Sequence, residues 1–156
     1  RAQYDFNGIY LLPVNLYGPG DNFDPRTSHV IPALIRKFSE HADRVTLWGD
    51  GTPSREFLYV RDAAAAIVAA TERYEGAAPV NLGSGHEIQM RELAAIIRDL
   101  CGSKAEIIWD SAMPNGQPRR GLDTSRAELA FGWRAQMPLE DGLRKTIAWW
   151  QANRPK

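Results

Sequence analysis

Residues 8–14 read G-I-Y-L-L-P-V and residues 15–23 read N-L-Y-G-P-G-D-N-F, and the junction between these two stretches decides the fold. The first stretch is short, apolar, and partly β-branched and aromatic, which predicts a strand buried on both faces of a parallel sheet. The second stretch is dense in polar and turn-forming residues, so we expect a loop there. Ligands of parallel α/β sheets bind at the carboxyl ends of the strands. Residues 15–23 are therefore the first place to look for a ligand site.

Strand and helix patterns alternate along the rest of the chain. Apolar residues at helical spacing predict a helix over residues 28–41, opened by Ser28, and further helices over 62–74, 90–101 and 139–150. Short apolar runs predict strands at residues 44–48, 79–82 and 106–109. Strands that alternate with helices indicate an α/β fold.

Bulk composition narrows the possible functions. The chain has 156 residues, and its 19 basic and 19 acidic residues give no formal net charge, which argues against a nucleic acid or a membrane surface as partner. The single cysteine, Cys101, cannot form an internal disulfide, and no signal or transmembrane run is visible. We therefore expect a cytoplasmic protein with no metal site, in which Cys101 is a buried structural thiol, with a reactive thiol as the alternative.

Several motifs, in order along the chain, resemble one family. The segment N-L-Y-G-P at residues 15–19 resembles a segment of the extended short-chain dehydrogenase/reductase family, the NAD-dependent epimerases and dehydratases of sugar nucleotides. The stretches S-H-V-I-P-A-L-I-R-K-F at 28–38 and W-G-D-G-T-P-S-R-E-F-L-Y-V-R-D at 48–62 are similar to its GDP-L-fucose synthase branch. V-N-L-G-S-G at 80–85 and P-N-G-Q-P-R-R-G-L-D-T-S-R at 114–126 follow in order. Several ordered motifs are stronger support than one loose pattern.

The resemblance implies an α/β fold that forms the carboxyl-terminal part of a Rossmann-type parallel sheet plus a small α+β substrate-binding domain. Residues 1–26 and 57–86 would belong to the dinucleotide-binding domain, and residues 27–56 and 87–156 to the substrate-binding domain. The family's G-x-x-G-x-x-G loop and Tyr-x-x-x-Lys pair are both missing from the sequence, where residues 83–85 form a bare G-S-G. We therefore expect a carboxyl-terminal fragment of a longer enzyme, inactive by itself and with exposed sheet edges.

The resemblance also assigns cofactor-binding residues. It implies that Pro13, Val14, Asn15 and Leu16 line the nicotinamide end of NADP, with NAD as a possible substitute. It further implies that His29 lies near the cofactor and transfers protons at the epimerised carbons. The residues alone leave other interpretations open, because Asn, Gly and Pro dominate turns for conformational reasons. A histidine at a helix start, where the helix dipole disfavours the imidazolium, is also commonly a surface residue.

A nucleotide sugar is the expected partner, and the resemblance assigns Asn22, Lys37, Trp48 and Arg55 to it. A diphosphate needs cations and bidentate donors, which Arg supplies best with Lys as a point charge, and a base needs a flat apolar neighbour such as Trp. The alternatives are core packing for Trp48 and a solvated helix face for Lys37.

A second basic loop adds Asn115 and Arg119 to the candidate substrate residues. Fucose synthases typically carry K-P-D-G here, whereas this chain has M-P-N-G at residues 113–116. A neutral Asn offers an acceptor and a donor in place of the acceptors of a carboxylate, so the identity of the base or the sugar stays open. Arg119 is equally well explained as an exposed loop charge.

The resemblance implies that the parent protein is an NADP-dependent 3,5-epimerase/4-reductase of GDP-4-keto-6-deoxymannose, and we expect a homodimer. Two other interpretations remain. One is another NDP-hexose epimerase or dehydratase, such as a UDP-hexose 4-epimerase. The other is a non-catalytic nucleotide-binding or dimerisation module.

Overall fold

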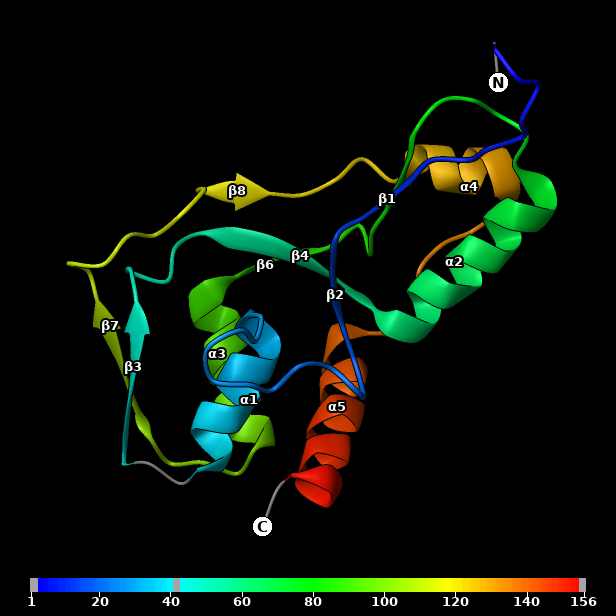
Figure 1. The fold of residues 1–156 in the computed structure, drawn as a ribbon. Coiled ribbons are helices and arrows are strands. Elements are labelled where there is room, and N and C mark those ends of the chain that lie inside the picture. Colours follow the sequence, from blue (N-terminus) through cyan, green and yellow to red (C-terminus); the bar gives the residue numbers. More distant parts are fainter. Residues whose placement is uncertain (1–2, 41–42, 155–156) are drawn as a thin grey trace.

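The structure is a computed structural model that describes residues 3–40 and 43–154. Strands and helices are mixed along the chain (Figure 1), which confirms the predicted α/β class. In chain order they are β1 Leu11–Pro13, β2 Asn15–Tyr17, α1 Val30–Ser39, β3 Arg44–Trp48, β4 Ser54–Tyr59, α2 Val60–Arg73, β5 Val80–Leu82, β6 Glu87–Gln89, α3 Met90–Leu100, β7 Glu106–Asp110, β8 Arg119–Arg120, α4 Ser125–Phe131 and α5 Leu139–Asn153.

One extended run of chain contributes to two sheets. β1 pairs in parallel with β5, where Leu11 lies opposite Val80, and β2 pairs in parallel with β4, where Asn15 lies opposite Phe57. Val14 alone separates the two strands. The prediction of a loop from residue 15 is therefore wrong for residues 15–17, because these residues find a hydrogen-bonding partner strand in β4.

The predicted burial of residues 8–14 on both faces is also wrong. Tyr10 is 60% exposed and Leu12 is 36% exposed, whereas Val14 is buried. Among the described residues, β1 pairs only with β5, in a two-stranded sheet, so one edge of β1 has no neighbouring strand. Side chains on this strand therefore lack the surroundings that bury a strand inside a wide parallel sheet. Leu16 on β2 and Ile67 on α2 are exposed apolar residues as well.

β4 is the central strand of the second sheet. It pairs in parallel with β2 and β8 and antiparallel with β6, where Ser54 lies opposite Gln89. A third sheet consists of β3 and β7 in parallel, with Val45 opposite Ile107. The pairings of β4 bring β2, β6 and β8, which are distant from one another in the sequence, into one sheet.

The apolar side chains form two cores. The larger core packs α1, α3 and α5 together with β3 and includes the buried Phe38, Leu93 and Leu143. The second core packs α2 and α4 with β5 and includes Val80 and Phe131. Figure 1 shows α2 and α4 at one end of the molecule and α1, α3 and α5 at the other. α4 lies within residues 87–156, which the resemblance places in the substrate-binding domain, and the domain boundaries stay a prediction.

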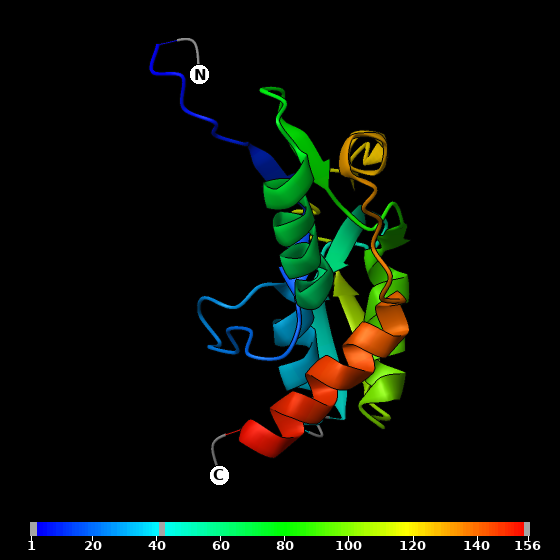
Figure 2. The same cartoon turned by 90° about the vertical axis from the view of Figure 1, so that its right-hand side faces the viewer.

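The helix boundaries differ slightly from the predicted ones. α1 begins at Val30 with His29 as its N-cap, so the predicted cap at Ser28 is one residue early. The predicted end at His41 lies outside the described residues. Figure 2 shows the segment between β2 and α1 projecting from the side of the molecule. α3 ends as expected at a C-cap on Cys101, followed by Gly102 with a left-handed φ of 70°.

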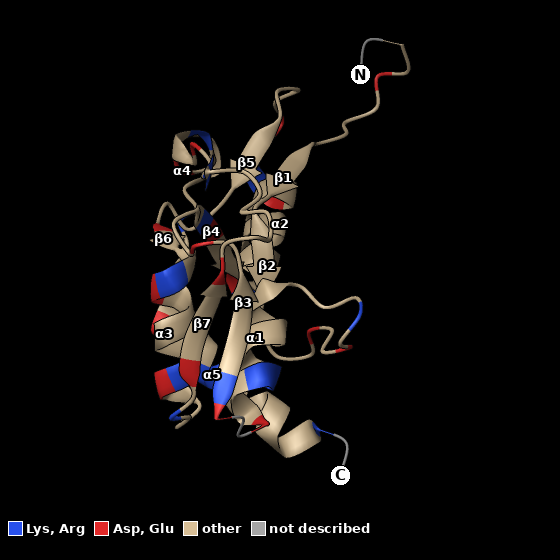
Figure 3. Cartoon of the chain, turned by 90° about the vertical axis from the view of Figure 1, so that its left-hand side faces the viewer, with Lys and Arg blue, Asp and Glu red and all other residues tan. Residues whose placement is uncertain are grey.

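Charges of both signs mix over the surface. Figure 3 shows acidic and basic residues side by side on α3 and at the neighbouring starts of β3 and β7. At those strand starts, Arg44 Nε lies 3.1 Å from Glu106 Oε2. Within residues 3–40 and 43–154, none of the helices combines the length and the apolar character that a membrane crossing needs.

Candidate functional site

A cavity of about 330 Å³ brings together four of the predicted site residues, Asn15, Trp48, Arg55 and Asn115. These four residues come from four separate segments of the chain, namely β2, the end of β3, β4 and the loop before β8. The other lining residues are Val30, Leu34, Leu47, Gly51, Pro53, Phe57, Met90, Trp109 and Pro114. The cavity therefore combines one cation and two amides with mainly apolar and aromatic walls.

Asn15 is fixed in place by β4. Its Nδ2 atom donates a hydrogen bond to the main-chain oxygen of Glu56 at 2.9 Å, and its backbone pairs opposite Phe57. Since the amide nitrogen is held in this way, the orientation of the Asn15 side chain at the cavity is defined by the sheet. Residue 15 is therefore part of a paired strand, and the alternative interpretation of a simple turn does not account for how its side chain is held.

Trp48 presents its indole at the rim of the cavity. The side chain is 66% exposed, so the alternative of core packing is wrong. The turn that follows Trp48 is held by Asn115, whose Oδ1 accepts a hydrogen bond of 2.8 Å from the Asp50 nitrogen. Gly49 has a left-handed φ of 81°, and a Cβ atom there would lie 2.1 Å from Asn115 Oδ1. The glycine thus permits both the turn and the close approach of the loop.

Arg55 supplies the positive charge of the cavity. Its Nη1 atom donates to the Ser54 main-chain oxygen at 2.7 Å, which anchors the half-buried guanidinium. Gly116 of the facing loop passes close by, since a Cβ atom on it would lie 3.4 Å from Arg55 Nη2. Among the described residues, no carboxylate forms an ion pair with Arg55. The guanidinium therefore keeps donors for an anionic ligand.

Of the predicted cofactor residues, Asn15 lines the cavity, whereas Pro13, Val14, Leu16 and His29 do not. Pro13 ends β1, the nitrogen of the following Val14 donates to the Leu82 oxygen at 2.9 Å, and Leu16 is exposed on β2. His29 is exposed at the start of α1, directly before the cavity residue Val30, and its side chain makes no capping hydrogen bond. Their cofactor and catalytic roles stay predictions.

Three predicted substrate residues lie outside the cavity. Asn22 organises its own loop, accepting from the Asp24 nitrogen at 2.9 Å. Lys37 Nζ donates to the Thr46 oxygen at 3.1 Å, and burial, followed by the charge of Arg36, lowers the pKa of Lys37. Arg119 is exposed. The substrate-binding roles of Asn22, Lys37 and Arg119 stay predictions.

Arg119 is engaged by a carboxylate. Its Nε atom lies 2.9 Å from Glu87 Oε1 and 3.0 Å from Oε2. The hydrogen bonds from Arg119 and Ser54 lower the pKa of Glu87, so the ion pair is formed at neutral pH. Arg119 therefore has a partner within the protein, whereas Arg55 has none among the described carboxylates.

The sequence reasoning missed the apolar walls of the cavity. Leu34 on α1 lies within the predicted helix over residues 28–41, and Trp109 ends the predicted strand at 106–109, but nothing in the sequence pattern marks either residue as a cavity wall. Gly51 in the W-G-D-G turn could have indicated a close contact at this point of the sequence. Its φ is 76°, and a Cβ atom on it would lie 2.7 Å from the Trp109 ring. A sequence pattern of apolar residues does not separate core walls from cavity walls.

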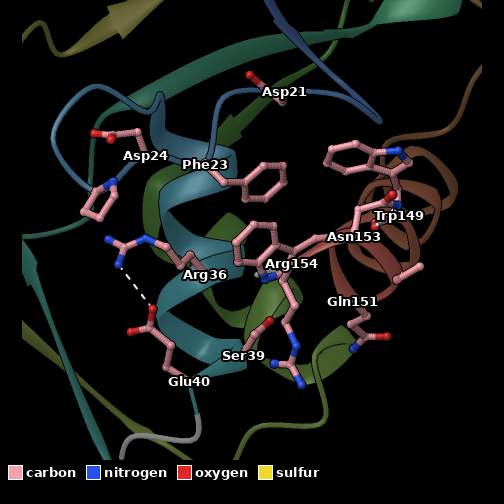
Figure 4. A pocket seen from close by; sticks show the side chains of 13 residues that line it. Asp21, Phe23, Asp24, Arg36, Ser39, Glu40, Trp149, Gln151, Asn153 and Arg154 are labelled. Carbon is pink, nitrogen blue, oxygen red and sulfur yellow. Dashed lines mark hydrogen bonds and ion pairs between the residues drawn. The ribbon is translucent and has the colours of Figure 1, made fainter. Parts of the chain in front are cut away.

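A larger cavity of about 1000 Å³ lies between the loop at Asp21 to Pro25, the outer face of α1 and the end of α5. Figure 4 shows Phe23 and Trp149 at this site. The rings of Phe23 and Trp150 stack with their centroids 4.3 Å apart. None of the predicted site residues lines it. Three buried side-chain atoms of residues that line this cavity have no hydrogen-bond partner among the described residues: Asp21 Oδ2, Arg36 Nε and Trp150 Nε1.

The chain is similar in sequence to known proteins. The chain is 43% identical over 157 residues to the probable GDP-L-fucose synthase 1 of Oryza sativa subsp. japonica, covering 98% of this chain and 48% of that protein. It is 41% identical over 169 residues to the GDP-L-fucose synthase of Escherichia coli K12, covering 100% of this chain and 52% of that one. The chain thus spans about half the length of these relatives.

Solved structures agree with this relationship. A GDP-L-fucose synthetase from Naegleria fowleri bound to NADP superimposes with a TM-score of 0.83 at 26% identity, covering 93% of this chain and 47% of that chain. Residues 1–83 match the sequence profile of a protein family. On this match, which covers more than half of the sequence, the chain belongs to the NAD dependent epimerase/dehydratase family.

Proposed function

We propose that the protein carrying this chain is an NADP-dependent epimerase/reductase that converts GDP-4-keto-6-deoxymannose to GDP-L-fucose, and that the chain supplies its nucleotide-sugar site. The observation that carries the proposal is the cavity in which Trp48, Arg55 and Asn115 converge beside Asn15. Relatives named GDP-L-fucose synthase at 41% and 43% identity support the choice of substrate.

The chemistry of the cavity suits a nucleoside diphosphate. The exposed indole of Trp48 offers a flat surface to a base, and the anchored guanidinium of Arg55 offers charge-assisted hydrogen bonds to phosphate. The Asn115 oxygen already accepts from the Asp50 nitrogen, which leaves the amide group of Asn115 as a donor for the ligand. Binding of the nucleotide would hold the sugar in a fixed position, and positioning supplies much of the catalysis in such a reaction.

The residues present fit the nicotinamide end of the cofactor. Leu16 exposes an apolar side chain next to the half-buried Asn15, at the point where β1 passes into β2. The flat nicotinamide ring can pack on the apolar side chain of Leu16. When bound, NADPH supplies the hydride that reduces the keto carbon. The site for the pyrophosphate would need a glycine-rich helix start that this sequence does not contain.

We propose that His29 exchanges a proton with the substrate. It stands at the N-terminus of α1 with an exposed side chain, and the next residue, Val30, lines the cavity. A neutral imidazole can accept a proton from a carbon next to a keto group, and the centre is inverted when a donor on the opposite face of the sugar returns a proton to that carbon. The Arg55 and Trp48 contacts would fix the sugar for this exchange.

The test uses protein expressed from the complete reading frame. With NADPH and GDP-4-keto-6-deoxymannose, the nicotinamide absorbance should fall and GDP-fucose should form, and neither should happen with UDP-glucose. Turnover of a UDP-hexose without net cofactor oxidation would instead support a 4-epimerase. Nucleotide binding without any turnover would support a binding module.

We also propose that the complete protein is a cytoplasmic homodimer. The absence of net charge and the single cysteine support a soluble protein of a reducing compartment. Light scattering of the purified protein measures its mass and decides between monomer and dimer.

A further inference from the structure

Glu56 is a carboxylate in the interior of the protein. It lies on β4 directly after the cavity residue Arg55, and it is 1% exposed. Burying a carboxylate is costly unless hydrogen bonds or a counter-charge replace the lost water. Within residues 3–40 and 43–154, no Lys or Arg forms an ion pair with Glu56, so hydrogen bonds provide the compensation.

Each oxygen of the Glu56 carboxylate holds a different loop. Oε1 accepts a hydrogen bond of 2.8 Å from the backbone nitrogen of Gly85, and Oε2 accepts one of 2.8 Å from the backbone nitrogen of Leu122. The chain at Gly83 approaches so closely that a Cβ atom there would lie 2.1 Å from Oε1. The carboxylate therefore connects the loop after β5 with the segment after β8.

The backbone of Glu56 connects a third segment. Its main-chain oxygen accepts the hydrogen bond from Asn15 Nδ2. One residue thus orients the Asn15 amide through its carbonyl group and fixes Leu122 through its side chain. Leu122 ends the stretch that begins after β7 and carries Asn115, and this stretch is attached to β4 a second time where the Ser54 nitrogen donates to the Pro118 oxygen at 2.9 Å.

We infer that Glu56 is a positioning residue of the nucleotide-sugar site: its carboxylate fixes the loop that carries Asn115 against the strand that carries Arg55. This inference rests on the proposed function of the cavity. Glu56 does not line the cavity itself, so it acts through the segment that its Oε2 atom holds at Leu122. Loss of the hydrogen bond from Leu122 would loosen the stretch that carries Asn115, and with it the turn beside Trp48, while the walls formed by α1 and β3 remain.

The variant Glu56→Gln tests this with little change in shape. Glutamine offers one acceptor oxygen and an amino group, so one of the two loop amides loses its acceptor. In protein from the complete reading frame, calorimetric titration should give a Kd for GDP about tenfold higher than that of the unaltered protein. The Kd for NADPH should change by less than about twofold, because the carbonyl group that holds Asn15 is unaltered.

Asp62→Ala is the matched control for a structural effect. Asp62 Oδ2 also accepts two backbone hydrogen bonds, from Gln136 at 2.9 Å and Met137 at 2.8 Å, but it joins α2 to the segment before α5 and does not line the cavity. This variant should lower the Tm and leave the Kd for GDP unchanged. If it weakens GDP binding as much as Glu56→Gln does, general destabilisation explains both results and the inference is overturned.

A double-mutant cycle tests the route of the effect. If Glu56 acts through Asn115, then Glu56→Gln should weaken GDP binding much less in an Asn115→Ala background than in the unaltered protein. A full effect in that background would contradict the inference. Hydrogen exchange gives a readout without any ligand, since the backbone amides of residues 113–122 should exchange faster in Glu56→Gln than in Asp62→Ala.

The outcomes separate the two proposals. If the unaltered protein does not bind GDP, the proposed function fails, and the hydrogen-exchange comparison still decides whether Glu56 fixes the loop. If GDP binds and Glu56→Gln changes neither its Kd nor the exchange rates, only the inference fails. Glu56→Asp retains the charge but shortens the reach by one methylene, and it should weaken GDP binding as well. If both variants fail to fold, Glu56 is structural and the inference is overturned.

Discussion

Replacing Arg55 by alanine is the sharpest test of the cavity. Arg55 is half-buried, and the bond from Nη1 to the Ser54 oxygen already restrains the side chain before a ligand arrives. Little conformational entropy is therefore lost when the remaining donors meet a phosphate. A hydrogen bond to a charged group contributes about 1.5–3 kcal/mol, which corresponds to a roughly ten- to hundredfold weaker Kd for GDP in Arg55→Ala.

Calorimetric titration of the complete protein with GDP and with NADPH measures the two effects separately. Arg44→Ala serves as the control, because it removes the same charge from the far end of β3, where Arg44 is exposed and paired with Glu106. We expect the GDP affinity to fall in Arg55→Ala alone and the NADPH affinity to stay constant in both variants. An equal loss for both ligands, or a loss in Arg44→Ala as large as in Arg55→Ala, would refute a specific phosphate contact.

The remaining predictions concern the base, the turnover, the core and the thiol. Asn115→Asp should favour GDP over UDP, ADP and dTDP by roughly fivefold or more in competition titrations, because one carboxylate oxygen can keep the Asp50 bond while the other accepts from guanine. The 156-residue chain alone should not oxidise NADPH above the rate without protein, since it lacks the Tyr-x-x-x-Lys pair. Phe38→Ala should lower the free energy of unfolding in urea by about 3–5 kcal/mol, because the ring is fully buried. Burial, partly offset by a hydrogen bond from Ser39, raises the pKa of Cys101, so alkylation should be slower than for free cysteine at the same pH and should accelerate as the pH rises.

The regular elements were predictable because their signals are local. The strand at residues 44–48 was predicted with the bounds that β3 has, and α3 and α5 begin where their apolar spacing begins. Each of these elements buries one stripe or face against a neighbour, so the period of the apolar residues contains the information. The same holds for the glycine that follows α3, whose left-handed φ follows from its position after a helix.

β4 could not be predicted in this way. Its sequence S-R-E-F-L-Y places a glutamate at the centre of the strand, and a charged residue normally indicates exposure. Glu56 is buried only because amides at positions 85 and 122 are brought to it by the fold. The positions of Trp48 and Arg55 were inferred from motif resemblance, while the apolar walls such as Leu34 carry no mark that separates them from the core.

Val14, the single residue between β1 and β2, limits where the chain can accept an insertion. Side chains alternate from one face of a strand to the other, so Asn15 reaches the cavity while the next residue, Leu16, points away and is exposed. One extra residue at Val14 would reverse this alternation in β2, turning an amide outward and a leucine inward. Insertions should therefore be tolerated in the projecting segment after β2 and not at Val14, although both positions lie between elements of regular structure.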